Sequence, residues 1–312
     1  MKKYLILGGN GFIGKYLTTY LSMDNEVVVA DYNIAHDFEK LNVTYQKLDF
    51  TNCHDFTYLL NGVDTVVHLV STIVPSDNTN SIRQDITDNV FPTIQLLDDM
   101  VKCNTKTIIF LSSGGTVYGE HSLSEILEDE VKNPICNYGI IKDLIEKYLQ
   151  LYYLYYQLDY RIIRLANPYS DVTKHGKSQG IIPIFADRLL NDEVVNIWGD
   201  GEDVRDYIYI DDAIQAILQI MQYDGDEKAF NVGTGKGYTV NHVLSLICDE
   251  LGVSNPNVCY QRGRKCDVKN NVLDINRVNS LIGWEPKVDL EEGIKKIVRK
   301  KVKGVSHDGK KK

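Results

Sequence analysis

The first half of the chain alternates short apolar runs with longer stretches in which apolar residues recur every three or four positions. The short runs are typical of buried strands, and the longer stretches are typical of amphipathic helices. This pattern predicts strands over 3–7, 26–30, 43–48, 65–69, 107–111 and 160–165, and helices over 12–21, 55–60, 82–103 and 138–158. Strands that alternate with helices in this way predict an α/β fold with a Rossmann-type, doubly wound parallel sheet.

Two features depart from this regular pattern. Pro92 falls inside the helix predicted over 82–103, so we expect that helix to be kinked or to start later. After Asn167, glycines, prolines and shorter apolar runs replace the alternation. The predicted domains are a Rossmann domain over 1–166 with part of 206–230, and a smaller C-terminal α/β domain over 167–205 and 231–312.

A glycine-rich turn follows the first predicted strand and opens the first predicted helix. It reads Gly8-Gly9-Asn10-Gly11-Phe12-Ile13-Gly14, with the spacing G-x-x-G-x-x-G. Strand, turn and helix are the context that a dinucleotide-binding fingerprint requires. Gly8 permits a tight turn, Gly11 lets the backbone approach a pyrophosphate, and Gly14 packs the helix against the strand. The free backbone N–H groups at the helix start, which Phe12 and Ile13 occupy, then hold the phosphates.

Asp31 ends the second predicted strand, roughly twenty residues past the glycines. An acid at this position accepts hydrogen bonds from the adenosine ribose hydroxyls and repels a 2′-phosphate. No arginine stands beside it in the sequence. The turn and Asp31 together therefore predict NAD as the cofactor, in preference to NADP.

A tyrosine and a lysine stand four residues apart near the middle of the chain, at Tyr138 and Lys142. On a helix these positions share one face, so the ammonium can lie close to the phenol. A free phenol has a pKa of about 10, and a neighbouring cation lowers that pKa toward the range of a useful acid or base. Downstream of a dinucleotide turn, the pair predicts an enzyme that moves a hydride between NAD and a substrate carbinol.

Composition and charge exclude several other classes of function. The chain of 312 residues is 43% hydrophobic, enough for one large core or two smaller ones. Its net charge of −9 gives nucleic acid no electrostatic reason to bind. No stretch approaches the ~20 apolar residues of a membrane helix. The six cysteines lack metal-binding spacing, so we expect reduced thiols, no metal site and a cytoplasmic protein.

Further motifs extend over nearly the whole length. They are Leu48–Thr51, Val67–Ser71, Asp88–Val90, Ser112–Gly119, Arg164–Tyr169, Gln179–Pro183, Ile197–Asp200, Val204–Ile208, Phe230–Gly233 and Arg264–Asp267. With the glycine turn and the tyrosine–lysine pair, they make the chain resemble the extended short-chain dehydrogenase/reductases. Within that group it resembles the NAD-dependent nucleotide-sugar 4-epimerases related to UDP-galactose 4-epimerase. The set is specific for the extended group and much less specific for one reaction within it.

The resemblance implies cofactor contacts beyond the glycine turn. It places Asp49 against the adenine and Leu69 beside the cofactor, and it makes Asn89 the asparagine that steadies the active site. Lys142 would bind the nicotinamide ribose and hold down the pKa of Tyr138, which would contact the cofactor as well as the substrate.

The resemblance also implies a substrate site in the C-terminal half. Arg205 and Arg264 resemble the arginines that clamp the substrate diphosphate, which suits their planar guanidinium groups. Asn167 resembles the asparagine that contacts the diphosphate, and Asp267 the acid near the nucleotide ribose. Structural roles stay open for two of them, an ion pair for Arg205 and a turn for Asn167.

A catalytic serine or threonine is implied in the turn Ser112–Gly119. Aligned on Val117-Tyr118-Gly119, the expected serine position is Gly114, and Ser113 lies one residue early. Either a shifted turn presents Ser113, the alternative that we favour, or Thr116 supplies the hydroxyl.

The reaction implied is epimerisation at C4 of a nucleotide sugar of the UDP-glucose/UDP-galactose type, through a transient 4-keto sugar. Tyr138 would act as the acid/base. An alternative is an NAD(P)H-dependent 4-ketoreductase of a UDP- or dTDP-linked 4-keto-6-deoxy sugar. A 4,6-dehydratase fits less well, because Gly114-Gly115 stand where that family has acids. A non-catalytic NAD-binding regulator is a distant alternative, since such proteins typically lose the tyrosine or the lysine.

Five tyrosines gather on the helix predicted over 138–158, at Tyr148, Tyr152, Tyr153, Tyr155 and Tyr156. In the family that the chain resembles, this helix commonly joins a four-helix dimer interface, and tyrosine is enriched at interfaces. We therefore expect a homodimer that acts on a small-molecule nucleotide sugar, UDP- or dTDP-linked.

Overall fold

The computed structural model describes residues 1–34, 42–75, 81–121, 125–170, 180–264 and 266–308, with side chains as far as residue 302. Gln179 and Lys265, which belong to two of the motifs above, lie outside the described residues. The chain divides into two compact units. Unit 1 comprises 1–119, 131–164 and 217–230, and unit 2 comprises 120–130, 165–216 and 231–312.

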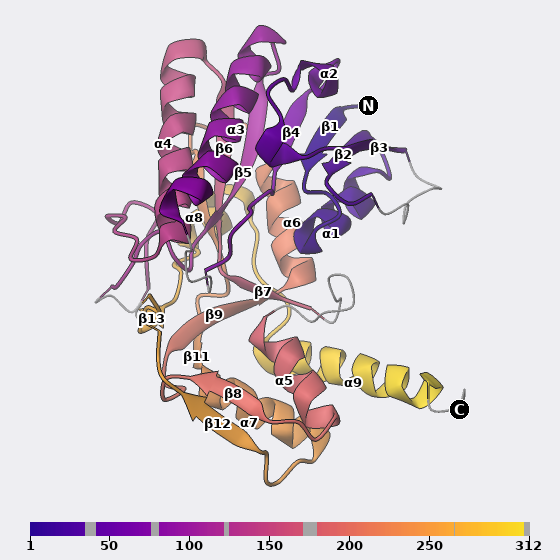
Figure 1. The fold of residues 1–312 in the computed structure, drawn as a ribbon, viewed down its shortest axis with the longest axis vertical. Coiled ribbons are helices and arrows are strands. Elements are labelled where there is room, and N and C mark those ends of the chain that lie inside the picture. The colour runs from indigo at the N-terminus through magenta and orange to yellow at the C-terminus, as the bar shows by residue number, and fades with distance from the viewer. Residues whose placement is uncertain (35–41, 76–80, 122–124, 171–179, 265, 309–312) are drawn as a thin grey trace. The chain divides into compact units, whose positions relative to one another are not determined.

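Unit 1 is built on a seven-stranded sheet in the order β10-β6-β5-β4-β1-β2-β3 (Figure 1). The strands are β1 (Lys3–Leu7), β2 (Glu26–Asp31), β3 (Val43–Lys47), β4 (Thr65–His68), β5 (Thr107–Ser113), β6 (Asp159–Leu165) and β10 (Ala229–Val232). The pairings among β1 to β5 are all parallel. Because the order reverses at β1, this is the arrangement of a doubly wound sheet, and the predicted fold class is confirmed.

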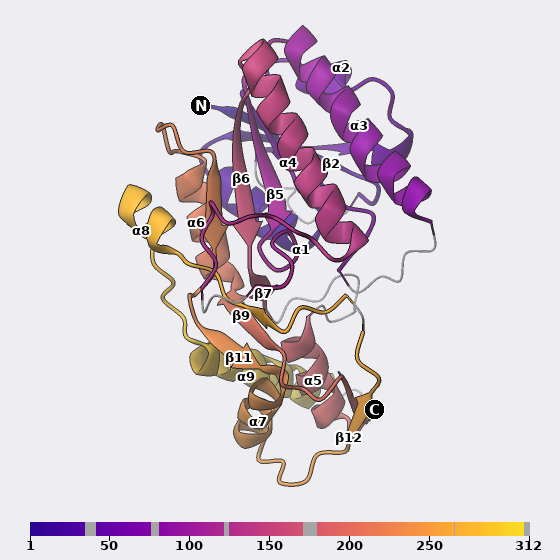
Figure 2. The same ribbon diagram turned by 90° about the vertical axis from the view of Figure 1, so that its left-hand side faces the viewer.

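Helices cover both faces of this sheet. They are α1 (Phe12–Leu21), α2 (Thr57–Leu60), α3 (Ile82–Lys102) and α4 (Asn137–Tyr156), with a short 3-10 helix, η1 (Phe50–Asn52), before α2. Figure 2 shows α3 and α4 side by side on one face, and α1 covers the other. α4 buries Ile141, Ile145 and Leu149, one residue from each successive turn, in the core of unit 1.

The helix α3 begins at Ile82 and continues through Pro92, so the predicted later start is wrong. Ser81 stabilises the first turn, because its hydroxyl accepts the N–H of Gln84 at 3.2 Å. Pro92 removes one helical N–H donor, but it is buried together with Val90 on the face that packs into unit 1. Tertiary packing therefore sustains a helix that local propensity alone would interrupt.

Unit 2 contains two smaller sheets. β7 (Asn167–Tyr169), β9 (Val204–Tyr209), β11 (Gly237–Thr239) and β13 (Asn270–Asn271) form one, and β8 (Val195–Trp198) pairs with β12 (Val258–Gln261). The helices are α5 (Ile181–Leu190), α7 (Val240–Leu251), α8 (Asn276–Ile282) and α9 (Leu290–Asp308), while α6 (Ile210–Ile220) begins in unit 2 and ends in unit 1. Ile182, Val243 and Ile294 represent its separate core.

Candidate active site

The glycine turn closes tightly between β1 and α1. Gly8 has a φ of +82°, a conformation that favours glycine, and its N–H donates to the carbonyl of Ala30 at 2.9 Å. A Cβ on Gly14 would lie 2.4 Å from the carbonyl oxygen of Gly8, so only glycine lets α1 approach the turn this closely. The first N–H groups of α1 have no partner within the helix and are available to an anion.

Asp31 is fixed to the glycine turn at the carboxyl end of β2. One carboxylate oxygen accepts the backbone N–H of Asn10 at 3.0 Å, and the other accepts that of Asn33 at 3.2 Å. Asn10 is almost fully buried, and its side-chain amide donates to the carbonyl of Asn33. Asn10 is thus a positioning residue that the glycine motif did not indicate, since it stands at one of the unspecified positions between the glycines.

The neighbouring strand ends supply the other predicted cofactor residues. Leu69 directly follows β4, and a Cβ on Gly8 would lie 3.5 Å from its carbonyl carbon. Asp49 is exposed before η1, where hydrogen bonds from Asn52 and then Thr51 lower the pKa of its carboxyl. The glycine cradle and the anchored Asp31 carboxylate fit a dinucleotide, which the turn, Asp31, Asp49 and Leu69 would hold.

The tyrosine and lysine lie in the first turns of α4. Lys142 is 4% exposed, and its Nζ lies 5.6 Å from the ring centre of Tyr138. That ammonium also donates to the carbonyl of Leu111 at 2.8 Å and sits 4.7 Å from the ring centre of Phe110. The structure therefore brings the predicted pair together and ties it to the end of β5.

Burial sets the charge of both groups. It lowers the pKa of Lys142 to about 8, against a smaller opposing effect of Glu146. It raises the pKa of the Tyr138 phenol, as does the nearby Cys136. The lowering of the Tyr138 pKa that the sequence predicted is therefore not a property of these side chains alone, because burial raises that pKa.

Asn89 joins α3 to the segment after β4. Its side-chain oxygen accepts the N–H of Thr72 at 2.9 Å, and its amide donates to the Thr72 hydroxyl at 2.6 Å. The Thr93 hydroxyl donates to the carbonyl of Asn89 at 2.6 Å, which leaves its oxygen to accept Nε2–H of His68 at 3.0 Å. Burial lowers the pKa of His68 to about 3, so this ring is neutral. These bonds hold the segment that contains Leu69 against α3.

The end of β5 and the turn that follows it offer three candidate hydroxyls, and the structure separates them. The Ser112 hydroxyl donates to the carboxylate of Glu146 at 2.5 Å. Ser113 is 9% exposed, and its carbonyl accepts the N–H of Val117 at 3.2 Å. The hydroxyl oxygen of Thr116 is buried and makes no hydrogen bond to the described residues.

The turn also touches the first turn of α4. A Cβ on Gly139 would lie 2.6 Å from the carbonyl oxygen of Thr116, so glycine allows the two backbones to meet directly beside Tyr138. The buried Glu146, one helical turn beyond Lys142, was missed by the sequence analysis. Its spacing of four and eight residues from the pair was the available signal.

Unit 2 carries the residues predicted to bind substrate. Asn167 on β7 and Arg205 on β9 lie on adjacent strands, and the Asn167 amide donates to the carbonyl of Asp206 at 2.9 Å. Arg205 donates to the carbonyl of Val204 at 2.9 Å. The Arg264 guanidinium lies 4.5 Å from a ring centre of Trp198, and the half-buried Asp267 follows three residues later.

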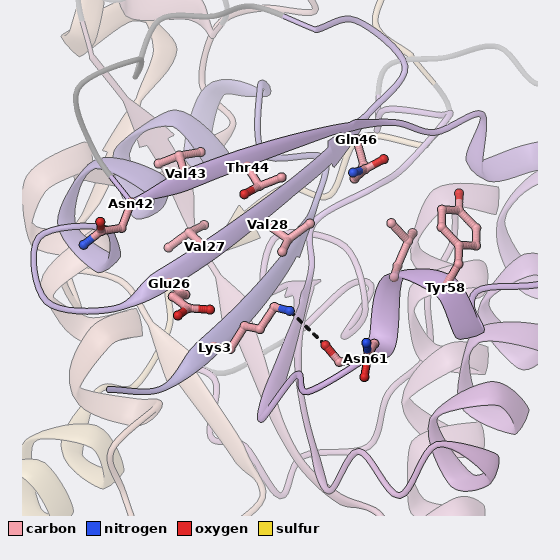
Figure 3. Close-up of a pocket in the computed structure, with 11 residues that line it drawn as sticks. Lys3, Glu26, Val27, Val28, Asn42, Val43, Thr44, Gln46, Tyr58 and Asn61 are labelled. Atoms are coloured by element: carbon pink, nitrogen blue, oxygen red, sulfur yellow. Dashed lines mark hydrogen bonds between the residues drawn. The ribbon is translucent and has the colours of Figure 1, made fainter.

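A cavity of about 440 Å³ opens elsewhere in unit 1, beside β1, β2 and β3 (Figure 3). Lys3, Glu26 and Val43 line it, and these residues begin their strands. The glycine turn instead follows the carboxyl end of β1, where ligands of open α/β sheets bind. The Lys3 ammonium is engaged by the carbonyl of Asn61 at 2.8 Å, so this cavity is not the predicted cofactor site.

The described ranges contain neither a candidate metal site nor a helix that could span a membrane. No group of histidine, cysteine, aspartate or glutamate side chains there is arranged to hold a metal ion. Among the described helices, none combines the length and apolar character needed to cross a membrane.

The chain is similar over nearly its whole length to known proteins, among them two sequence relatives and one solved structure. The chain is 31% identical to dTDP-4-dehydro-6-deoxyglucose reductase of Escherichia coli, over 95% of this chain and 96% of that protein. It is 33% identical to a putative UDP-glucose 4-epimerase of Methanocaldococcus jannaschii, over 94% and 96%. The crystal structure of UDP-glucose 4-epimerase from Thermotoga maritima with UDP-glucose has a TM-score of 0.87 and 34% identity, covering 97% of this chain and 99% of that one.

The model of the NAD dependent epimerase/dehydratase family matches residues 4–233, which include the glycine turn, Tyr138 and Lys142. This match confirms the resemblance to the extended short-chain dehydrogenase/reductases, and it confirms NAD as the cofactor of the family. The two sequence relatives are named for different reactions, a reduction and an epimerisation. The chain belongs to the NAD-dependent epimerase/dehydratase family of nucleotide-sugar enzymes.

Proposed function

We propose that the protein interconverts the C4 epimers of a UDP-linked sugar of the glucose/galactose type. The observation that carries this proposal is the arrangement in unit 1 of Tyr138, Lys142 and the buried Thr116 hydroxyl, which has no hydrogen-bond partner among the described residues, in a domain with a dinucleotide turn. The epimerase relatives from Methanocaldococcus jannaschii and Thermotoga maritima support the reaction, and the bound UDP-glucose of the latter supports the UDP group.

The two units divide the work in this proposal. Unit 1 holds NAD through Gly8, Gly11 and Gly14, the N–H groups of Phe12 and Ile13, and the side chains of Asp31, Asp49, Leu69 and Asn89, with Tyr138 and Lys142 at its reactive end. Unit 2 holds the nucleotide sugar through Asn167, Arg205, Arg264 and Asp267. The guanidinium groups of Arg205 and Arg264 match diphosphate oxygens, and Trp198 already orders that of Arg264.

Proton transfer at C4 falls to the Tyr138 phenol. Bound NAD supplies the hydride acceptor and donor at the same carbon. Tyr138 removes the proton of the C4 hydroxyl and returns it once the sugar has presented its other face. The buried Lys142 ammonium, held by the carbonyl of Leu111, stabilises the tyrosinate that accepts this proton and that forms again when the proton returns to the sugar.

The reacting C4 oxygen also needs a hydrogen-bond donor from the turn after β5. The hydroxyl of Ser112 is already bound to Glu146, so Ser113 and Thr116 are the proposed donors. The Thr116 hydroxyl is buried without a partner in the described part of the chain, and this supports Thr116 in a way that the sequence did not indicate. Separate Ser113→Ala and Thr116→Val variants identify the donor, because only its removal slows turnover by about tenfold or more.

Product analysis tests the function. Purified protein is incubated without added NAD with UDP-glucose, UDP-galactose and their N-acetyl forms, and the products are separated by chromatography. Interconversion of a C4 pair without net NADH is expected. Tyr138→Phe should keep its fold and lower turnover by about 10²–10⁴-fold. Absence of any interconversion by the wild type would contradict the proposal.

A 4-ketoreductase is the second candidate, because the Escherichia coli relative at 31% identity is named for that reaction. A reductase would use the same tyrosine, lysine and hydroxyl but consume NAD(P)H at every turnover. Stoichiometric oxidation of NADPH or NADH by a dTDP- or UDP-linked 4-keto-6-deoxy sugar, without interconversion of UDP-sugars, would favour it.

Exposed apolar side chains on α3 and α4 support a homodimer as the functional oligomeric state. Phe91 on α3 is 59% exposed, and Leu154 and Tyr155 on α4 are 70% and 73% exposed. Large apolar side chains that are exposed on two neighbouring helices are consistent with an interface. Light scattering after size exclusion should give twice the chain mass, and Leu154→Glu should shift it toward the monomer.

A further inference from the structure

Glu146 is a buried charge to which the proposed reaction assigns no part. Its side chain is 0% exposed on α4 and accepts hydrogen bonds from three directions. Arg164 donates through Nε at 3.2 Å and through a terminal nitrogen at 2.8 Å, and Lys132 donates at 2.7 Å. The Ser112 hydroxyl donates at 2.5 Å. A carboxylate so enclosed holds its neighbours in fixed positions.

The end of β5 is tied to α4 by two consecutive residues. The carbonyl of Leu111 accepts from Lys142, and the hydroxyl of Ser112 donates to Glu146. Lys142 and Glu146 are one helical turn apart on α4, so together they hold two consecutive residues at the end of β5. The next residues form the turn that carries Ser113 and Thr116, and Thr116 meets α4 at Gly139. The position of the hydroxyl turn beside Tyr138 therefore depends on these two attachments.

Glu146 also acts on Lys142 through charge. The pKa of Lys142 is lowered chiefly by burial, and Glu146 opposes that effect. Other titratable or charged groups face the pair from the surrounding elements: Tyr138 and Asp143 on α4, Lys132 before it, His68 on β4, Tyr160 and Arg164 on β6, and Tyr118 after β5. Among these groups, Glu146 forms ion pairs with both cations, Arg164 and Lys132.

We propose that Glu146 is a positioning residue of the active site, which fixes the hydroxyl turn through Ser112 and supports Lys142 one helical turn away. This inference rests on the proposed function only for its kinetic consequences. A solely structural ion pair between Glu146 and Arg164 would hold β6 to α4 without affecting either the turn or the lysine.

Three variants separate these roles. Glu146→Gln removes the charge but leaves an oxygen that accepts the Ser112 hydroxyl. Glu146→Asp keeps the charge, but its shorter side chain moves the carboxylate away from its partners by the length of one methylene group. Ser112→Ala removes the attachment and leaves the ion pair. Asp143→Asn is the matched control, because it removes a carboxylate from the same helix that also pairs with Lys132.

The kinetic test measures kcat and KM of the holoenzyme for C4 interconversion between about pH 6 and pH 10. Glu146→Gln should lower kcat by about tenfold and move the alkaline limb of its pH profile down by about one pH unit, with little change in KM. Glu146→Asp and Ser112→Ala should lower kcat by about threefold and keep the wild-type limb. Asp143→Asn should match the wild type.

A direct titration of Lys142 keeps the proposal testable if the protein turns over no UDP-sugar. Lysine labelled with ¹³C at Cε is incorporated, its Lys142 signal is assigned with Lys142→Arg, and its titration is followed by NMR. The midpoint should lie near 8 in the wild type and fall in Glu146→Gln.

If Glu146→Gln folds, either of two results would overturn the proposal. One is a folded Glu146→Gln variant with the wild-type lysine midpoint. The other is a loss of kcat in that variant without any shift of the alkaline limb, which indicates structure alone. If Glu146→Gln does not fold, unchanged kcat in both Ser112→Ala and Glu146→Asp overturns it. Failure of the wild type to interconvert UDP-sugars, with the midpoint shift present, would instead count against the proposed function alone.

Discussion

Each unit of the protein encloses a carboxylate that is 0% exposed, Glu146 in unit 1 and Asp206 in unit 2, and the two are stabilised in different ways. In unit 1, the cations Arg164 and Lys132 hold Glu146, and they lower the pKa of its carboxyl against the effect of burial. In unit 2, neutral donors hold Asp206: the N–H and hydroxyl of Thr234 and the N–H of Gly235, at 2.7 to 3.2 Å. Burial there raises the pKa of the carboxyl to about 6.

The comparison shows what kind of partner a buried charge needs. Full positive charges offset the desolvation of Glu146, whereas dipoles offset only part of the desolvation of Asp206. Each carboxylate stands beside a proposed functional residue, because Glu146 is one turn from Lys142 and Asp206 follows Arg205 directly. Asp206 ties the Gly233–Gly235 turn to β9, much as Glu146 ties the end of β5 to α4.

The largest expected effect comes from neutralising Glu146. Glu146→Gln leaves the buried Arg164 guanidinium without its counter-charge, so the free energy of unfolding should fall by about 3–5 kcal/mol. Urea denaturation of the wild type and the variant at pH 7, followed by circular dichroism, measures the difference. A loss below about 1 kcal/mol would mean that water already compensates Arg164 in the native protein.

Neutralising Asp206 should cost less. Asp206→Asn loses some of its accepted hydrogen bonds, but it also removes a charge that burial disfavours, so we expect a loss of about 1–2 kcal/mol. The same denaturation experiment makes the comparison, with Asp200→Asn, an exposed acid of unit 2, as the control. An equal loss in Asp206→Asn and Glu146→Gln would remove the distinction between the two sites.

Much of the fold could be predicted from the sequence, because the helix and strand periods of unit 1 directly reflect burial. The strand predicted over 65–69 is β4, and the helix predicted over 138–158 is α4 within two residues at its end. Pro92 misled the prediction, because packing of α3 outweighs the loss of one N–H donor. The short strands of unit 2 show no comparable spacing of apolar residues, so the sequence predicted where this smaller domain lies but not its individual strands.

The site was less predictable than the fold, because its side chains depend on tertiary contacts. Glu146 and Asp206 read as ordinary surface acids in the sequence, since acids are seldom buried without partners and the partners are distant in the chain. Burial raises the pKa of Tyr138 in the chain alone, and the extent of that burial could not be predicted from a motif. The bond from Ser112 to Glu146, which removes one hydroxyl from the catalytic choice, spans 34 residues.

The two carboxylates should also respond differently to pH. Asp206 has a raised pKa, so the folded state binds more protons between about pH 4 and 6, and its contribution to stability grows as the pH falls. Wild type should gain about 1 kcal/mol relative to Asp206→Asn between pH 7 and pH 5. Glu146 has a lowered pKa, so its stabilisation persists over that range and is lost only as the pH falls below about 4.5.

Denaturation of the wild type and both variants at pH 7, 6 and 5 measures these slopes. The difference between wild type and Asp206→Asn should widen toward pH 5, and the difference between wild type and Glu146→Gln should stay constant. A parallel change in the two differences would show that global charge, and not the local partners, governs the response.

The smallest expected effect comes from removing one neutral donor from the Glu146 site. Ser112→Ala deletes a single hydrogen bond while Arg164 and Lys132 keep the carboxylate compensated, so the loss should be about 0.5–1 kcal/mol. Thr234→Val is the matched variant in unit 2, because it deletes the hydroxyl that donates to Asp206 at 2.7 Å. Asp206 relies on such neutral donors, so Thr234→Val should cost more than Ser112→Ala and should raise the pKa of Asp206 further. A larger loss for Ser112→Ala would mean that the hydroxyl, and not the cations, carries the Glu146 site.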